Sequence, residues 1–376
     1  MQEALENQTT GSDDVAQVQD VTELLAYVGE HRCSDLHVKT GSPPTVRVSG
    51  NITKMKLPKV DPETAEMLAQ QLMSSEEAVH LKEHGEVDFA YSMAGVGRFR
   101  VNIHRQRGSL AIAARRVLAG APKFEELGLP PAVEKLANEH RGLLLVTGPT
   151  SSGKTTTTGA VIRHINHTRA CHILTIEDPI GILHSDDQAI ITQREVGMDT
   201  NGFAPALRAA MRQDPDVIFI GEIRDLETVK AALQAAETGH FVIATLHTTN
   251  VQETVTRIID FFPADQHNQA RVAVAGSLVG IVTQRLLSKK GGGRVVAIEI
   301  LINNGRIRDC ILNPDQTHMI HDIVEESDFY GMQTFDQALV QLYRAGVITL
   351  EDAMSGATRA HDFKLRLQAE GLEPVT

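Results

Sequence analysis

The stretch Gly148-Pro149-Thr150-Ser151-Ser152-Gly153-Lys154-Thr155 matches the P-loop pattern G-x-x-x-x-G-K-[ST] at every position. It follows an apolar run, residues 143–147, that is typical of a buried parallel strand, and it precedes residues 156–165, which suit a helix. A helix start offers N–H groups and a positive dipole end to phosphate oxygens, and glycines let the backbone curl around them. This order of strand, loop and helix favours a phosphate site over a chance glycine-rich turn.

The P-loop predicts ATP and Mg²⁺ as ligands. The Lys154 ammonium can reach the β- and γ-phosphates, and the Thr155 hydroxyl can bind the metal ion. We therefore expect nucleotide contacts from Gly148, Pro149, Thr150, Ser151, Ser152, Gly153, Lys154, Thr155 and Thr156.

The composition of the chain narrows the class of protein. Its 376 residues suit two or three domains, and the net charge of −12 argues against a general binder of nucleic acid or anionic membranes. Three widely separated cysteines indicate neither a zinc pair nor a disulfide framework, so we expect a reducing cytoplasm. Apolar runs stay well short of the roughly 18 residues of a membrane span, so any work at a membrane is expected to use a partner protein.

The pattern of helices and strands predicts two folded regions. The polar, acidic residues 1–19 suggest a disordered tail, and residues 20–117 read as a small α+β domain, followed by a linker at 118–125. Strands and helices then alternate, which predicts a parallel sheet with crossover helices. Toward the end we expect a helix over 266–287, a break at the glycines 291–293, a strand-like stretch and then short amphipathic helices.

Polar residues follow the predicted parallel strands at the points where each strand ends. Ligands of such sheets bind outside the carboxyl ends of the strands, so these residues are expected to converge on the P-loop. The residues concerned are Glu177 and Asp178, Glu222, and His247.

Each of these residues has a candidate role and a plainer alternative. Glu222 is placed to act as general base or to orient water, whereas Gly221 stands where many P-loop enzymes have a metal-binding aspartate. Glu177 and Asp178 are candidates to tune the water or the metal, or else to cap a turn. His247 is a candidate contact of the γ-phosphate, or else a structural histidine.

Arginines gather near the end of the first region. They are Arg98, Arg100, Arg105, Arg107, Arg115 and Arg116. Alternation along a strand puts Arg98 and Arg100 on one face, where a cationic rim can supply arginine fingers within or across subunits. The alternative for any one of them is a solvated or ion-paired position.

Six stretches together resemble one family. They are residues 97–102 (GRFRVN), the P-loop, 175–180 (TIEDPI), 193–196 (QREV), 212–225 (RQDPDVIFIGEIRD) and 236–249 (AETGHFVIATLHTT). The chain is similar to the secretion ATPases and, within them, to the type IV pilus retraction (twitching-motility) ATPases of the PilT type. The long N-terminal region and tetracysteine zinc insert typical of the assembly ATPases are not found in the sequence.

The resemblance implies a fold and a set of roles. It implies an α/β protein with a PAS-like domain at 20–117, a RecA-like ATPase core at 126–290 and a mostly helical extension at 291–376. It further implies a homohexamer in the cytoplasm, held peripherally at the inner membrane by the pilus platform protein, with neither nucleic-acid binding nor membrane insertion. The implied residue roles are Glu222 as catalytic base, His247 as γ-phosphate contact, and Arg98, Arg100 and Arg115 as fingers.

One departure from the family pattern keeps rival functions open. The family motif EDPIE ends here in Gly181, which supplies no carboxylate, and Glu177, Asp178 or Asp186 are candidates to replace it. We expect an active retraction motor, because Lys154, Thr155 and Glu222 are intact. The alternatives are an accessory nucleotide-binding paralogue with little hydrolysis, an assembly ATPase of a pilus or type II secretion system, and a DNA-translocating ATPase, against which the net acidity argues.

Overall fold

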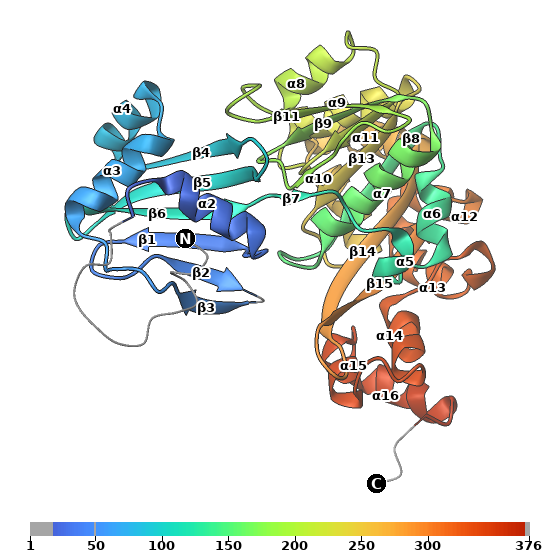
Figure 1. Cartoon of the computed structure of the whole chain (residues 1–376). Helices are drawn as coiled ribbons and strands as arrows, with labels where there is room; N and C mark the ends of the chain where they lie inside the picture. Colours follow the sequence, from blue (N-terminus) through green and yellow to red (C-terminus); the bar gives the residue numbers. More distant parts are fainter. Residues whose placement is uncertain (1–17, 49, 373–376) are drawn as a thin grey trace. The chain divides into compact units, whose positions relative to one another are not determined.

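The computed structural model describes residues 18–48 and 50–372, and within them the chain forms two compact units, up to Ala119 and from Gly120 onward (Figure 1). Most of the tail predicted at 1–19 lies outside the described residues. In the described ranges, no helix is both long enough and apolar enough to cross a membrane.

The first unit is an antiparallel sheet with helices, as predicted. The sheet has the strand order β3-β2-β1-β6-β5-β4. Alternate residues of β5 and β6, among them Phe99, Val101 and Ala114, are buried in one core with Leu24 of α2 and Leu68 of α3. Its elements are α2 (Val21–Glu30), β1 (Asp35–Lys39), β2 (Thr45–Val48), β3 (Asn51–Lys54), α3 (Pro62–Leu72), α4 (Ser75–His84), β4 (Glu86–Met93), β5 (Gly97–Gln106), β6 (Ser109–Arg116) and β7 (Leu118–Ala119).

The second unit is built on a seven-stranded sheet in the order β11-β9-β12-β13-β8-β14-β15, parallel except for β15. Its first part contains α5 (Phe124–Leu127), α6 (Pro131–Ala137), β8 (Gly142–Thr147), α7 (Lys154–Thr168), β9 (His172–Glu177), β10 (Ile182–Leu183), β11 (Ile190–Glu195), α8 (Phe203–Ala210), β12 (Val217–Ile220), α9 (Leu226–Glu237), β13 (Phe241–Leu246) and α10 (Val251–Asp260). The rest contains η1 (Ala264–Gln266), α11 (His267–Ser277), β14 (Leu278–Ser288), β15 (Arg294–Ile302), α12 (Gly305–Leu312), η2 (Pro314–Met319), α13 (Ile320–Glu325), η3 (Asp328–Tyr330), α14 (Phe335–Arg344), α15 (Leu350–Gly356) and α16 (Ala360–Ala369).

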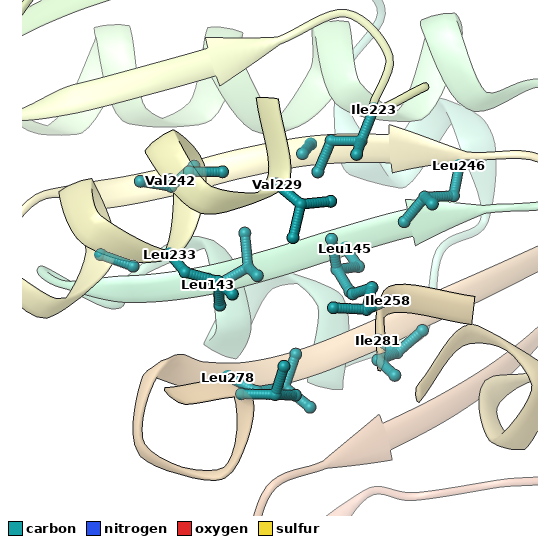
Figure 2. Close-up of a cluster of buried hydrophobic side chains, with 14 of the residues drawn as sticks. Leu143, Leu145, Ile223, Val229, Leu233, Val242, Leu246, Ile258, Leu278 and Ile281 are labelled. Atoms are coloured by element: carbon teal, nitrogen blue, oxygen red, sulfur yellow. The ribbon is translucent and has the colours of Figure 1, made fainter. Parts of the chain in front are cut away.

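The sheet of the second unit lies between two apolar layers. Leu143 and Leu145 of β8 point to the side of α9 and α10, where Val229 and Ile258 pack against them (Figure 2). The alternate residues of β8 point to the opposite face and pack with α6 and α7. Burial on both faces explains why β8, β12 and β13 are continuous apolar runs rather than alternating ones. The predicted fold class, a parallel-sheet P-loop unit after a smaller α+β unit, is confirmed.

The helix predicted over 266–287 is wrong in its second half. The chain leaves α11 at Ser277 and continues as β14, which pairs with β8 on one side and with β15 on the other. The residues from 278 onward are apolar and rich in β-branched side chains, so a short run of them does not distinguish a buried helix from a buried strand. The open edge of β8 decides the outcome, because an added strand satisfies its backbone groups.

The predicted boundary between 290 and 291 also needs correction. Gly291, Gly292 and Gly293 have φ angles of 87°, 106° and 84° and form the turn between β14 and β15. The seven-stranded sheet therefore extends to Ile302, and the helical region begins only after it. Helices α14, α15 and α16 then pack onto the turn end of this hairpin, where Phe335 and Leu339 meet Leu287 (Figure 1).

Candidate active site

The P-loop makes a tight turn between β8 and α7, and its glycines avoid clashes that a side chain would cause. A Cβ on Gly148, whose φ is 142°, would lie 2.5 Å from the carbonyl oxygen of Gln284 and 2.6 Å from Ser152 Oγ. Ser151 has a φ of 65°, and Gly153, with a φ of 95°, caps the start of α7. The loop thus leads directly into the first turn of α7, which is the backbone arrangement that a phosphate site requires.

The side chains of the loop take different positions. Ser152 is buried, whereas Thr150, Ser151 and Thr155 are exposed. The ammonium of Lys154 donates to the carbonyl oxygens of Gly148, at 2.6 Å, and Pro149, at 3.0 Å. Thr156 lies half exposed on the first turn of α7. The lysine is therefore held over the loop by short contacts to the loop's own backbone.

The strand ends bring His247 and Glu222 to Lys154, as predicted. His247 Nε2 lies 3.0 Å from Glu222 Oε1, and Lys154 Nζ lies 3.4 Å from His247 Nδ1. The tautomer that carries its proton on Nε2 satisfies both contacts, since it accepts from the lysine and donates to the carboxylate. A continuous line of polar contacts therefore runs from the phosphate loop to Glu222.

Arg224 extends this line and was given no role from the sequence. Its Nη2 donates to Glu222 Oε2 at 2.8 Å, and its Nη1 lies 3.7 Å from Asp178 Oδ2. The signal that points to it is its place two residues after Glu222, which puts both side chains on one side of an extended segment. Burial works against ionisation of Glu222, but hydrogen bonds and charge from Arg224 and His247 outweigh it and hold the pKa of Glu222 below its ordinary value. Glu222 is thus ionised and fixed in orientation at neutral pH.

Burial lowers the pKa of Lys154, and the nearby charge of Glu222 opposes that shift. The two groups are therefore electrically linked across the site. An anion bound at the loop favours the charged form of the lysine.

Glu177 lies inside the protein rather than on the rim. Its side chain accepts hydrogen bonds from Thr175 Oγ1 at 2.8 Å, from the backbone N–H of Gly181 at 3.0 Å and from Gln193 Nε2 at 3.2 Å. Burial raises the pKa of Glu177, and these three bonds oppose the rise. The arrangement commits Glu177 to holding the turn at 178–181, so it favours a structural role over the catalytic one predicted.

Two glycines at the rim are closely packed, so a side chain added at either position requires its neighbours to move. A Cβ on Gly181 would lie 2.5 Å from Thr155 Cγ2, and one on Gly221 would lie 3.2 Å from the Cα of Glu177 and from the carbonyl oxygen of Ile176. Asp186, suggested as a substitute, accepts from the backbone N–H of Ile191 and lies beside residues 163–167 of α7. Those residues are roughly 12 Å or more along the helix from Thr155, at 1.5 Å per residue. The expectation that Asp186 replaces the carboxylate missing at Gly181 is therefore wrong.

The three candidate finger arginines share one face of the first unit's sheet. Arg100 and Arg115 are directly opposite each other on β5 and β6, and Arg98 lies two residues along β5 on the same face. Arg115 Nε donates to the buried carboxylate of Asp35 at 2.7 Å. Arg115 and Arg100 are both exposed, but Arg115 has an ion-pair partner within its own unit, as the ion-paired alternative predicted.

A buried line of threonine hydroxyls beneath the site was missed entirely. Thr147, directly before the P-loop, lies 2.8 Å from Thr283 and 3.4 Å from Thr254 between hydroxyl oxygens, and Thr254 lies 2.7 Å from Thr248. This line joins the base of the P-loop to the segment that carries His247. Four threonines, on β8, on α10, on β14 and in the segment after β13, give no recognisable spacing in a sequence, so only the fold reveals the connection.

The fold and the site define a RecA-like P-loop ATPase with a smaller α+β unit before it. A family model described as type II/IV secretion system protein matches residues 13–308. The chain belongs to this family, and it is an ATPase of the secretion class.

Individual relatives place it more closely. The type IV pilus retraction ATPase PilT of Pseudomonas aeruginosa is 41% identical over 92% of this chain and 100% of its own length. The type IV pilus ATPase PilU of the same organism is 40% identical over 92% of this chain and 90% of its own. A crystal structure of the pilus retraction motor PilT with bound ADP superposes with a TM-score of 0.86, at 46% identity over 92% of this chain and 99% of that one. The resemblance to pilus retraction ATPases is therefore confirmed.

Proposed function

We propose that this chain is the ATP-hydrolysing motor of type IV pilus retraction, acting as a homohexamer. The observation that carries the proposal is the line of contacts from Lys154 through His247 to Glu222, which joins a phosphate-binding loop to an ionised carboxylate. The relatives supply the process, since two of those most similar in length and sequence are named as pilus retraction or twitching-motility proteins. The relatives are needed for this step, because one fold can support many chemistries.

The geometry suits hydrolysis with Glu222 as base. The first turn of α7 and Lys154 hold the phosphates, which places the terminal phosphorus near the rim. Glu222, kept ionised and held by Arg224, accepts a proton from the attacking water or orients that water in line. His247 lies between Lys154 and Glu222, so it is placed to contact the γ-phosphate by a hydrogen bond.

The residues present fit Mg²⁺ bound chiefly through phosphate. Mg²⁺ takes six oxygens and usually keeps several waters, with only one or two ligands from the protein. Thr155, which is exposed, can supply one such ligand through its hydroxyl, while Gly181 and Gly221 supply no carboxylate. When bound, the ion neutralises charge on the phosphates. In the described part of the chain, no group of three or more acidic, histidine or cysteine side chains forms a metal site by itself.

Arg98 and Arg100 are the fingers we propose, ahead of Arg115. Replacing Arg100 by alanine is expected to lower kcat at least tenfold with little change in nucleotide affinity, because a finger acts on charge that develops in the transition state. Arg105→Ala on the same strand is the matched control. Mixing the Arg100→Ala and Glu222→Gln proteins tests the source of the finger: turnover recovers in mixed rings if the arginine serves a neighbouring subunit. Unchanged turnover of Arg100→Ala itself removes it from the proposal.

Retraction itself is tested in a piliated bacterium whose own retraction ATPase has been deleted. We expect the wild-type chain to restore twitching and reduce surface pili, and Glu222→Gln to leave pili extended. Recovery by Glu222→Gln as well as by wild type indicates the accessory function, in which binding and assembly matter and hydrolysis does not. Peripheral attachment at the inner membrane through the pilus platform protein is part of the same proposal, and co-purification with that protein checks it.

A further inference from the structure

Glu299 lies in the middle of β15 with only 2% of its surface exposed, which is unusual for a carboxylate. It stands opposite Thr283 of β14, in the edge pair of the ATPase sheet. Its Oε2 accepts a hydrogen bond of 2.8 Å from the backbone N–H of Val251, the first residue of α10. A buried carboxylate at this place therefore satisfies one of the N–H groups that a helix start leaves without an internal partner.

The start of α10 is close along the chain to the active site. His247 follows β13, and α10 begins four residues later, so the segment between them has little freedom. Thr254 ties the segment to the helix, through Thr248 Oγ1 at 2.7 Å and the carbonyl oxygen of Asn250 at 2.8 Å. The first turn of α10 is thus joined by short contacts to the segment that carries His247.

We propose that Glu299 is a positioning residue for ATP hydrolysis: its charged carboxylate anchors the first turn of α10 to β15 and so holds His247 against Glu222 and Lys154. This inference rests on the proposed function, in which His247 takes part in turnover. Glu299 itself touches none of the predicted nucleotide contacts. Its effect is through the geometry of His247, and small displacements of such groups are costly to catalysis.

The environment of Glu299 makes this role depend on pH. Burial raises the pKa of Glu299 to about 7, Asp336 adds to the rise, and the Val251 bond and the charge of Arg285 oppose it. Glu299 is among the residues that line a cavity of about 900 Å³ between α10, α13 and the last helices. The charged or titratable groups around it are Glu253, Arg285, His318, His321, Asp322, Glu325, Asp336, Arg359, Asp362, Arg366 and Glu370.

The charge of Glu299 changes near neutral pH. Above pH 7 Glu299 is charged and makes a charge-assisted bond to Val251, and as the pH falls through about 7 it gains a proton and the bond weakens. Glutamine resembles the protonated form, because it offers a neutral carbonyl acceptor of the same shape. Turnover of the wild type is therefore expected to approach that of Glu299→Gln at low pH.

The experiment compares steady-state ATPase activity of the full chain and Glu299→Gln from pH 5.5 to 8.5. We expect kcat of the variant to be lower by roughly fivefold at pH 8.5 and equal within error at pH 5.5, with KM for ATP changed less than twofold. Glu326→Gln, an exposed carboxylate paired with Arg306, is the control. Asp336→Asn removes a charge that raises the pKa of Glu299, so it is expected to move the midpoint to lower pH. Its result decides the matter if Glu299→Gln does not fold.

Two further readouts separate the possible outcomes. At pH 8 Glu299→Gln is expected to raise the melting temperature while it lowers kcat, since a buried charge is removed, whereas loss of general integrity lowers both. In a His247→Ala background Glu299→Gln is expected to have no further effect on kcat. A ratio of activities that is constant with pH, or additive effects, overturns this inference alone. Full activity of His247→Ala overturns the proposed role of His247 and, with it, the route through which Glu299 acts.

Discussion

Replacing Glu222 by glutamine is expected to lower kcat for ATP hydrolysis by roughly 100-fold or more, which is the usual contribution of a general base. Glutamine keeps the size of the side chain but only one acceptor oxygen, so one of the two donors, Arg224 or His247, faces an amide NH2 group instead of an oxygen. It has no charge and accepts no proton from water at neutral pH. The measurements are steady-state turnover and, separately, binding of a fluorescent ATP analogue, which we expect to stay within about threefold of wild type because the P-loop is untouched.

The control for this prediction is Glu227→Gln, an exposed glutamate on α9 near Arg208. Glu177→Gln provides a sharper comparison, since it is buried and accepts three hydrogen bonds. If Glu177 is structural, its glutamine variant keeps most of kcat and loses stability instead. Turnover within a few-fold of wild type in Glu222→Gln contradicts the assignment of the base.

Adding a side chain at Gly181 is expected to impair the enzyme rather than improve it. A Cβ at this position lies 2.5 Å from Thr155 Cγ2, so Gly181→Ala forces the side chain of Thr155 to move. Thr155 carries the hydroxyl proposed for Mg²⁺, and we expect kcat to fall at least tenfold and the requirement for Mg²⁺ to rise. Gly181→Glu, which restores the family's carboxylate, is expected to be at least as impaired for the same steric reason.

A second substitution tests this explanation directly. Thr155→Ser removes the methyl group in question, keeps the hydroxyl and still fits the P-loop pattern. We expect Thr155→Ser alone to keep most of the activity and the double variant Gly181→Ala/Thr155→Ser to recover much of what Gly181→Ala loses, a non-additivity typical of residues in contact. Strictly additive losses count against the steric account. A Gly181→Glu enzyme faster than wild type indicates instead that the chain lacks a ligand and is a weakly active paralogue.

The sequence predicted which side chains meet at this edge of the sheet, because that outcome depends on short spacings and on strand order. A P-loop is one continuous segment, and the rule that parallel strands deliver their carboxyl ends to one edge needs only the order of the strands. Lys154, Glu222 and His247 could therefore be expected to meet, and they do. The same reasoning put Arg98 and Arg100 on one face of a strand, since side chains alternate along it.

Other features depended on partners far away in the chain. The apolar residues after Ser277 became a strand because β8 offered an open edge, which the periodicity of that run does not encode. Glu177 looked like a rim carboxylate by position, but Thr175, Gln193 and the Gly181 N–H enclose it. Glu299 carried no motif at all, and its contact with Val251 spans 48 residues.

The sequence by itself therefore determined the class of chemistry: a phosphate loop at a helix start, a strand-end carboxylate and a histidine, all set by short spacings and strand order. The tertiary structure decided which carboxylates are open to react and which are buried supports. It also showed that a side chain at position 181 would collide with the methyl group of Thr155, so the glycine there has a steric reason. Burial and steric fit depend on atoms brought close by folding, so no local pattern of residues specifies them.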